Sequence, residues 1–210
     1  MSHEEMANPK AIKDSDQDDA ECKKDCQISF LGHKHPLQNC WCLWFLRNEK
    51  NRVWSDNLRI VTKFDTVEDF WALYNHIQPA SRLLSGSDYS VFKDGISPMW
   101  EDEKNRMGGR WLVMLSRQQR HLLLDTFWLE TLLCLIGEAF EEGSGDICGS
   151  VLSVRSKGDR VALWTSDADR KHAVLTVGRI YKERLGLHPE SVMAYQPHAD
   201  TAAKSGDFSI

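Results

Sequence analysis

Long apolar runs are missing from this chain of 210 residues. A membrane-spanning helix needs roughly 20 consecutive apolar residues, and no stretch reaches that length. Residues 1–27 are acidic and polar and have no apolar core, so we expect no secretory signal. These absences predict a protein of the cytoplasm or the nucleus.

An excess of positive charge is also missing. Lys and Arg total 26 and Asp and Glu total 31, which gives a net charge of -5 at pH 7. Proteins that coat nucleic acid through bulk electrostatics need many surplus cations. The composition therefore leaves room only for a local basic site.

Familiar catalytic and metal-binding motifs are absent as well. We find no G-x-S-x-G element and no P-loop. The spacings of the cysteines fit no familiar zinc knuckle, so we expect free thiols and neither metal nor cofactor. The six cysteines are Cys22, Cys26, Cys40, Cys42, Cys134 and Cys148.

The length and the hydrophobic content of 41% suit one well-packed domain. Residues 1–30 have too few apolar groups to offset the cost of ordering, so we predict a disordered tail there. The binding domain is predicted over residues 31–197, and a small, polar, flexible tail over residues 198–210. No internal repeat is present.

Hydrophobic periodicity predicts strands and helices in mixed order. Strands are predicted at 40–46, 89–93, 110–115, 148–155 and 160–165, and helices at about 65–77, 125–140 and 169–185. Asp65 and Asp125 are predicted to cap the first two helices. The pattern indicates the α+β class, with one antiparallel sheet and helices on one face.

A tryptophan and a carboxylate stand side by side in a polar segment broken by proline, residues 97–102. Adjacent side chains in an irregular loop can turn toward one ligand, whereas in a strand they point to opposite faces. Trp100 could therefore cover a flat ring while Glu101 accepts hydrogen bonds from N1 and N2 of guanine. The alternative is a surface tryptophan packed on its own loop beside solvated acids.

Basic residues surround the predicted hairpin turn at 156–159. Arg155, Lys157 and Arg160 could bind phosphate, because arginine grips it through two parallel donors. The alternative is an ordinary charged turn. Trp164, in the strand that follows, is either core or a wall of the site.

These features together suit one ligand. Trp54 is a second tryptophan in a polar setting, and stacking contributes roughly 1–3 kcal/mol per base. A ring made cationic by alkylation at N7 adds a cation–π attraction of up to about 2 kcal/mol. A bidentate contact to the base edge adds roughly 1–3 kcal/mol of discrimination. The combination favours methylated guanine followed by phosphates.

Longer matches carry a resemblance to a known family. They are His35–Asn39, Phe64–Trp71, Met99–Asp102, Gly108–Trp111 and Trp128–Gly137. Over about residues 30–206, the chain resembles the cap-binding translation initiation factor 4E family. The resemblance implies a curved, eight-stranded antiparallel sheet with three helices on its convex face. It also implies a non-catalytic monomer that binds the 7-methylguanosine cap of messenger RNA in the concave slot.

The resemblance further implies a role for each site residue. Trp54 and Trp100 would enclose the base, Glu101 would bind its Watson–Crick edge, and Trp164 would contact the N7 methyl group. The phosphates and the following nucleotide would be bound by Arg110, Arg155, Lys157, Arg160 and Lys204.

A second surface is implied for protein partners. It would bind a Tyr-x-x-x-x-Leu-Φ helix of the scaffold factor 4G or of 4E-binding repressors through His35, Pro36, Val67, Trp71, Leu129, Glu130, Leu133 and Gly137. The surplus apolar residues of the predicted second helix agree with recognition of a helix in a groove. The predicted function is to bind capped messenger RNA and recruit it to the translation initiation machinery.

Two other functions remain open at this point. One is a nucleotide hydrolase that uses Glu101, Asp102 and Glu103 as metal ligands or bases, although we expect Asp102 and Glu103 to be solvated neighbours. The other is a repressor that binds the cap but not the scaffold. The chain also departs from the family with Arg160 in place of a usual lysine and Asp207 in place of a regulatory serine, so phosphorylation at 207 is not expected.

Overall fold

The structure is a computed structural model that describes residues 32, 34–47, 57–199 and 208–210. It divides the chain into two compact units, Met1–His35 and Pro36–Ile210. All the helices and strands of the described residues lie in the second unit. In that described part, no helix combines the length and apolar character needed to span a membrane.

The second unit is built on a sheet that has eight strands within the described residues. They are β1 (Pro36–Arg47), β2 (Leu58–Thr66), β3 (Ser87–Lys93), β4 (Gly109–Leu115), β5 (Ile147–Ser153), β6 (Asp159–Thr165), β7 (Ala194–Pro197) and β8 (Phe208–Ser209). Their order is β2-β1-β3-β5-β6-β4-β7-β8, and every neighbouring pair is antiparallel. The predicted α+β class with one antiparallel sheet is confirmed.

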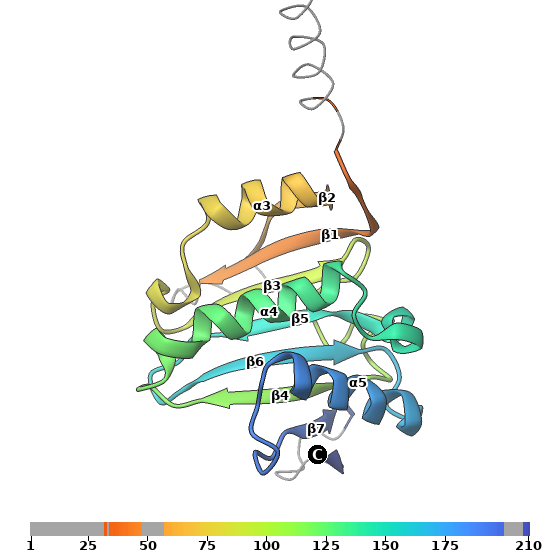
Figure 1. Cartoon of the computed structure of the whole chain (residues 1–210). Coiled ribbons are helices and arrows are strands. Elements are labelled where there is room, and N and C mark those ends of the chain that lie inside the picture. Colours follow the sequence, from red (N-terminus) through yellow and green to blue (C-terminus); the bar gives the residue numbers. More distant parts are fainter. Residues whose placement is uncertain (1–31, 33, 48–56, 200–207) are drawn as a thin grey trace, which may run out of the picture. The chain divides into compact units, whose positions relative to one another are not determined.

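Three α-helices of the described residues, α3 (Val67–His76), α4 (Asp125–Ile136) and α5 (Lys171–Arg184), cover one face of this sheet (Figure 1). Shorter helical segments are η1 (Ala80–Arg82), η2 (Arg120–Leu124) and η3 (Glu141–Asp146). The core between helices and sheet contains large, fully buried side chains, among them Trp41, Trp111, Trp128, Tyr181 and Tyr195. None of these three α-helices covers the opposite face of the sheet, so that face is open to a ligand.

Strand β4 shows how the sequence separates the two faces. Trp111, Val113 and Leu115 are buried in the main core, and the indole N–H of Trp111 donates to the carbonyl of Val174 in α5 over 3.0 Å. Since side chains alternate along a strand, Arg110 projects from the other face. The same alternation on β5 and β6 brings further polar side chains to that face.

The structure corrects several local predictions. Thr66, not Asp65, caps α3, and its hydroxyl accepts from the N–H of Asp69 over 3.2 Å. Asp125 does not cap α4, because the chain is already helical in η2, a π-helix. Its carboxylate instead accepts from the N–H and hydroxyl of Ser81, at 2.8 and 2.6 Å.

The predicted division into a domain over residues 31–197 and two flexible tails stays a prediction as a whole. Two parts of the predicted C-terminal tail are nevertheless held by the sheet, which corrects the expectation at those residues. His198 is buried. Strand β8 pairs with β7, and the backbone of Ile210 exchanges two hydrogen bonds with Met193, at 3.0 and 3.1 Å.

Candidate functional site

A cavity of about 400 Å³ opens on the face of the sheet opposite the helices. Nine residues were predicted for this site, and six of them line the cavity: Trp100, Glu101, Arg110, Arg155, Arg160 and Trp164. Lys157 is exposed and lies outside the lining. Trp54 and Lys204 lie outside the described residues, so their predicted contacts stay predictions.

The loop before β4 presents Trp100 and Glu101 to this cavity. Trp100 is 56% exposed, so its ring is not part of the core. Asp102 holds the loop, because its carboxylate accepts from the backbone N–H groups of Ser97 and Lys104, both at 2.9 Å. Asp102 is half-buried, so it supports the loop while part of its side chain stays in contact with solvent.

Asn105 is a second support of the same loop. It is completely buried, and its amide nitrogen donates to the carbonyls of Ser97 and Met99, both over 2.8 Å. Nothing in the spacing of the sequence distinguishes this asparagine from a surface residue. The position of Trp100 thus depends on Asp102 and Asn105, and nothing in the sequence marks either residue as a support of the loop.

Trp164 forms an inner wall of the cavity and is also well packed. It is 6% exposed, and its ring lies edge-on to Phe92 with centroids 5.4 Å apart. The ring of His198 lies 4.1 Å away on centroids. Burial, with Arg110 nearby, lowers the pKa of His198 to about 4, so this imidazole is neutral at physiological pH. The sequence left core and site wall open for Trp164, and the structure gives it both roles.

Two of the three arginines are oriented by neighbours on the sheet. The guanidinium of Arg110 donates to the side-chain oxygen of Gln196 in β7, at 2.8 and 3.3 Å. Burial and the nearby charge of Arg160 lower the pKa of Arg110. Two cations that line one cavity favour the binding of an anion there.

Arg155 is held through both its side chain and its backbone. Its guanidinium forms two contacts with the carboxylate of Asp88 in β3, at 2.5 and 2.9 Å, and this partner raises the pKa of Arg155. Its backbone N–H donates to Asp159 over 3.0 Å. Asp88 also lines the cavity, and the sequence analysis did not select it.

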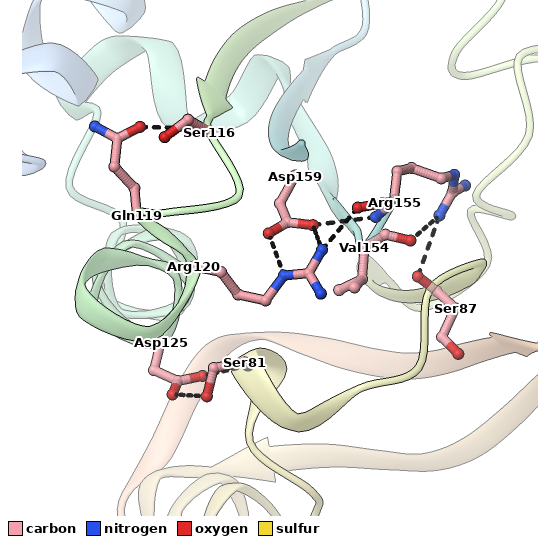
Figure 2. A network of polar contacts seen from close by, with 9 residues as sticks. All are labelled: Ser81, Ser87, Ser116, Gln119, Arg120, Asp125, Val154, Arg155 and Asp159. Atoms are coloured by element: carbon pink, nitrogen blue, oxygen red, sulfur yellow. Dashed lines mark hydrogen bonds and ion pairs between the residues drawn. The ribbon is translucent and has the colours of Figure 1, made fainter. Parts of the chain in front are cut away.

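A buried ion pair supports the loop that carries Arg155 (Figure 2). Arg120 of η2 donates twice to the carboxylate of Asp159, at 2.7 and 2.8 Å, and once to the carbonyl of Arg155, over 2.7 Å. Asp159 has no exposed side-chain surface, and Arg120 only 15%. The charged turn between Arg155 and Asp159 is therefore anchored by a buried ion pair.

Six of the eight residues predicted for a partner surface lie on α3, on α4 or directly after α4. Trp71 on α3 is 38% exposed and packs edge-on against Phe70 and Tyr74. The remaining members are Pro36 at the start of β1, Val67 on α3, Leu129, Glu130 and Leu133 on α4, and Gly137 after α4. His35 belongs to the other unit, so its predicted place on this surface stays a prediction.

Gly137 ends α4 where a side chain has no room. A Cβ atom there would lie 2.8 Å from the carbonyl oxygen of Leu133. Leu129, Glu130 and Leu133 are half-buried, and Gly137 is exposed. Leu129 and Leu133, which lie one turn apart on α4, thus form a half-buried apolar strip.

The described cysteines are free thiols, as predicted for them. Burial raises the pKa of Cys42 and Cys134 to about 11 and that of Cys148 to about 12. Cys22 and Cys26 lie outside the described residues. In the described part of the chain, no three His, Cys, Asp or Glu side chains are grouped so that they could hold a metal ion.

The cavity lined by Trp100, Trp164 and the three arginines is called the slot below. Together with the fold, it defines a class of α+β proteins that have one open antiparallel sheet, helices on one face and an aromatic, arginine-lined slot on the other. The chain belongs to the family described as eukaryotic initiation factor 4E, whose sequence model matches residues 36–209. The predicted family is thereby confirmed.

Individual relatives agree with this assignment. Eukaryotic translation initiation factor 4E-1A of Danio rerio is 64% identical over 173 residues, which are 82% of this chain and 80% of that protein. The structure of Ascaris suum eIF4E-3 with m2,2,7G cap has a TM-score of 0.82 and 48% identity, and the match covers 85% of this chain and 99% of that one. C. elegans eIF4E-3 with the 4E-binding protein Mextli and cap analog has a TM-score of 0.80 and 49% identity, over 85% of this chain and 100% of that one.

Proposed function

We propose that this protein binds the 7-methylguanosine cap of messenger RNA in the slot and recruits the message to the translation initiation machinery through its helical face. The observation that carries this proposal is a single cavity that combines exposed Trp100, the adjacent Glu101, and Arg110, Arg155 and Arg160. Support comes from the Ascaris suum relative in complex with a methylated cap and from the C. elegans relative with a cap analog.

Each group suits a different part of the ligand. Trp100 would stack on the methylated base, and a cationic ring gains up to about 2 kcal/mol from such a contact when water is excluded. Glu101 would accept from N1 and N2 of guanine, and Trp164 would lie against the methyl group. The arginines would bind the phosphates, assisted by Lys157 in the adjacent turn. Trp54 and Lys204 keep the roles predicted for them, the second stacking ring and a contact to the following nucleotide.

Quenching of tryptophan fluorescence tests the proposal. We expect 7-methyl-GTP to bind far more tightly than GTP, because only the methylated ring is cationic. Trp100→Ala should remove most of this binding, whereas Trp71→Ala, which changes another exposed tryptophan on the helical face, should leave it intact. Equal affinity for the two nucleotides would show that the slot does not recognise a cap.

We also propose that the protein is not an enzyme. Both carboxylate oxygens of Asp102 accept backbone N–H groups of their own loop, which suits a support of Trp100 better than a base or a metal ligand. Cap analog should therefore be recovered unchanged after prolonged incubation with the protein. Release of a nucleotide product would favour the hydrolase instead.

The partner surface is proposed for a Tyr-x-x-x-x-Leu-Φ helix of a 4G scaffold or a 4E-binding repressor. An exposed tryptophan on α3 and a half-buried apolar strip on α4 suit an amphipathic helix. The relative in complex with Mextli, a 4E-binding protein, supports such a partner. Trp71→Ala should abolish capture of the peptide and leave cap binding unchanged; if both fell together, the two surfaces would not be separate. A location in the cytoplasm or nucleus and a monomeric state complete the proposal.

A further inference from the structure

Asp88 is a carboxylate in the wall of a slot that is proposed to bind phosphates. Only 15% of its side chain is exposed, so solvent screens it incompletely. A negative charge in this position repels a phosphate at close range. Its effect on a neighbouring cation must outweigh that repulsion if the slot is to bind an anion well.

The cation is Arg155, and the geometry of the pair is specific. Nη1 of Arg155 contacts Oδ1 of Asp88 at 2.5 Å, and Nη2 contacts Oδ2 at 2.9 Å, so the carboxylate occupies the end of the guanidinium. Nη1 also donates to the carbonyls of Val154 and Ser87, at 2.9 and 3.3 Å (Figure 2). The hydrogens of Nη1 are therefore used.

Two donors of the same guanidinium remain. A guanidinium has five N–H groups in one plane. Within the described residues, neither the Nε hydrogen nor the second hydrogen of Nη2 has an acceptor, and both lie in the plane and point outward from the same edge of the guanidinium. Together they form a second fork, which has the geometry for two parallel hydrogen bonds to a phosphate.

The base of the side chain is fixed as well. The backbone N–H of Arg155 donates to Asp159, and its carbonyl accepts from Arg120. With Asp88 at the far end, the long side chain is ordered before any ligand arrives. A ligand then avoids the cost of immobilising a flexible arginine.

We propose that Asp88 is a positioning residue, which turns the free fork of Arg155 toward an oxyanion of the phosphate chain in the slot. This inference rests on the proposed function, because it assigns the anion to the phosphates of the cap. It predicts that Asp88 affects binding of the phosphates and not of the base.

Two probes separate these contributions: 7-methyl-GTP, and 7-methylguanosine, which has no phosphate. Asp88→Ala should weaken binding of 7-methyl-GTP by roughly 2- to 12-fold, the effect of leaving one side chain to be ordered on binding. Binding of 7-methylguanosine should stay within about twofold of the unaltered protein. Asp88→Asn keeps the shape and one acceptor oxygen, so its affinity for 7-methyl-GTP should lie between those of Asp88→Ala and the unaltered protein. This variant replaces Asp88→Ala in the comparison if the alanine variant does not fold.

A double-variant cycle provides the control. If Asp88 acts through Arg155, then Asp88→Ala should cause no further loss of 7-methyl-GTP binding in a protein that already carries Arg155→Ala. Tighter binding of 7-methyl-GTP by Asp88→Ala would show that repulsion dominates, and equal weakening of both probes would show a merely structural role; either result overturns the inference. Failure of the cap proposal is seen separately, as equal affinity of the unaltered protein for GTP and 7-methyl-GTP.

Discussion

Asp159→Asn should destabilise the domain strongly although it replaces a single oxygen. Asp159 is completely buried and accepts three hydrogen bonds, two from Arg120 and one from the backbone N–H of Arg155. Asparagine has one oxygen, so its amide hydrogens would face a donor of Arg120, whose charge would lose its counterion. Removing one partner of a buried ion pair costs roughly 3–5 kcal/mol.

This loss can be measured by urea unfolding followed through tryptophan fluorescence. For a domain of this size, 1 kcal/mol corresponds to roughly 2–4 °C in Tm. The Tm should therefore fall by roughly 6–20 °C. The urea concentration at the midpoint should also fall, while the dependence of the unfolding free energy on urea concentration stays unchanged.

The matched control replaces both partners. Arg120→Met combined with Asp159→Leu leaves no unpaired charge, and such apolar pairs are often close to neutral. We expect each single variant to be much less stable than the double variant. A loss below about 1 kcal/mol for Asp159→Asn, or single losses that simply add in the double variant, would refute the argument, because uncoupled residues give additive changes.

Three further changes test separate parts of the structure. His198 has a pKa of about 4, so between pH 6.5 and 4 the unfolded chain takes up a proton that the folded domain does not. The unaltered protein should lose roughly 3 kcal/mol of unfolding free energy across that window relative to His198→Gln, measured by urea unfolding at each pH. Gly149→Ala places a Cβ atom 2.4 Å from the carbonyl oxygen of Val91 and should cost about 1–3 kcal/mol in thermal unfolding. Gly145→Ala, where no described atom lies within 4 Å of the new Cβ, should cost much less. Asn105→Ala leaves the carbonyls of Ser97 and Met99 without their donor, so amide hydrogen exchange in residues 97–106 should become faster while exchange in the sheet is unaffected. Equal exchange rates in this loop would contradict the role of Asn105 as its support.

The elements that bury an apolar face were predictable from the sequence. Strands β5 and β6 and the helix α5 carry enough hydrophobic residues to show their periods, and the structure confirms them near the predicted positions. Strand β2 was missed because it is an edge strand whose side chains are mostly exposed, so apolar and polar residues do not alternate. Strands β7 and β8 are too short to show a period.

The candidate site was predictable where its residues have an unusual local setting. A tryptophan beside a glutamate in a polar loop, and arginines around a turn, stand out in the sequence, and they line one cavity. The supports of these residues have no such signal. Asp88 and Arg155 are 67 positions apart, and Arg120 and Asp159 are 39 apart, so only the fold reveals each pair.

The length of η2 determines which residues of α4 face the sheet. Arg120 at the start of η2 contacts Asp159, and Asp125 at the start of α4 contacts Ser81. Residues five apart on an α-helix differ by about 140° around its axis, whereas π-helical hydrogen bonds join residues five apart and bring them nearer to one side. Adding one more residue with α-helical geometry would rotate these two anchors by about 100° relative to each other. Because Leu122 in this segment is 77% exposed, we infer that the segment tolerates substitution much better than an insertion.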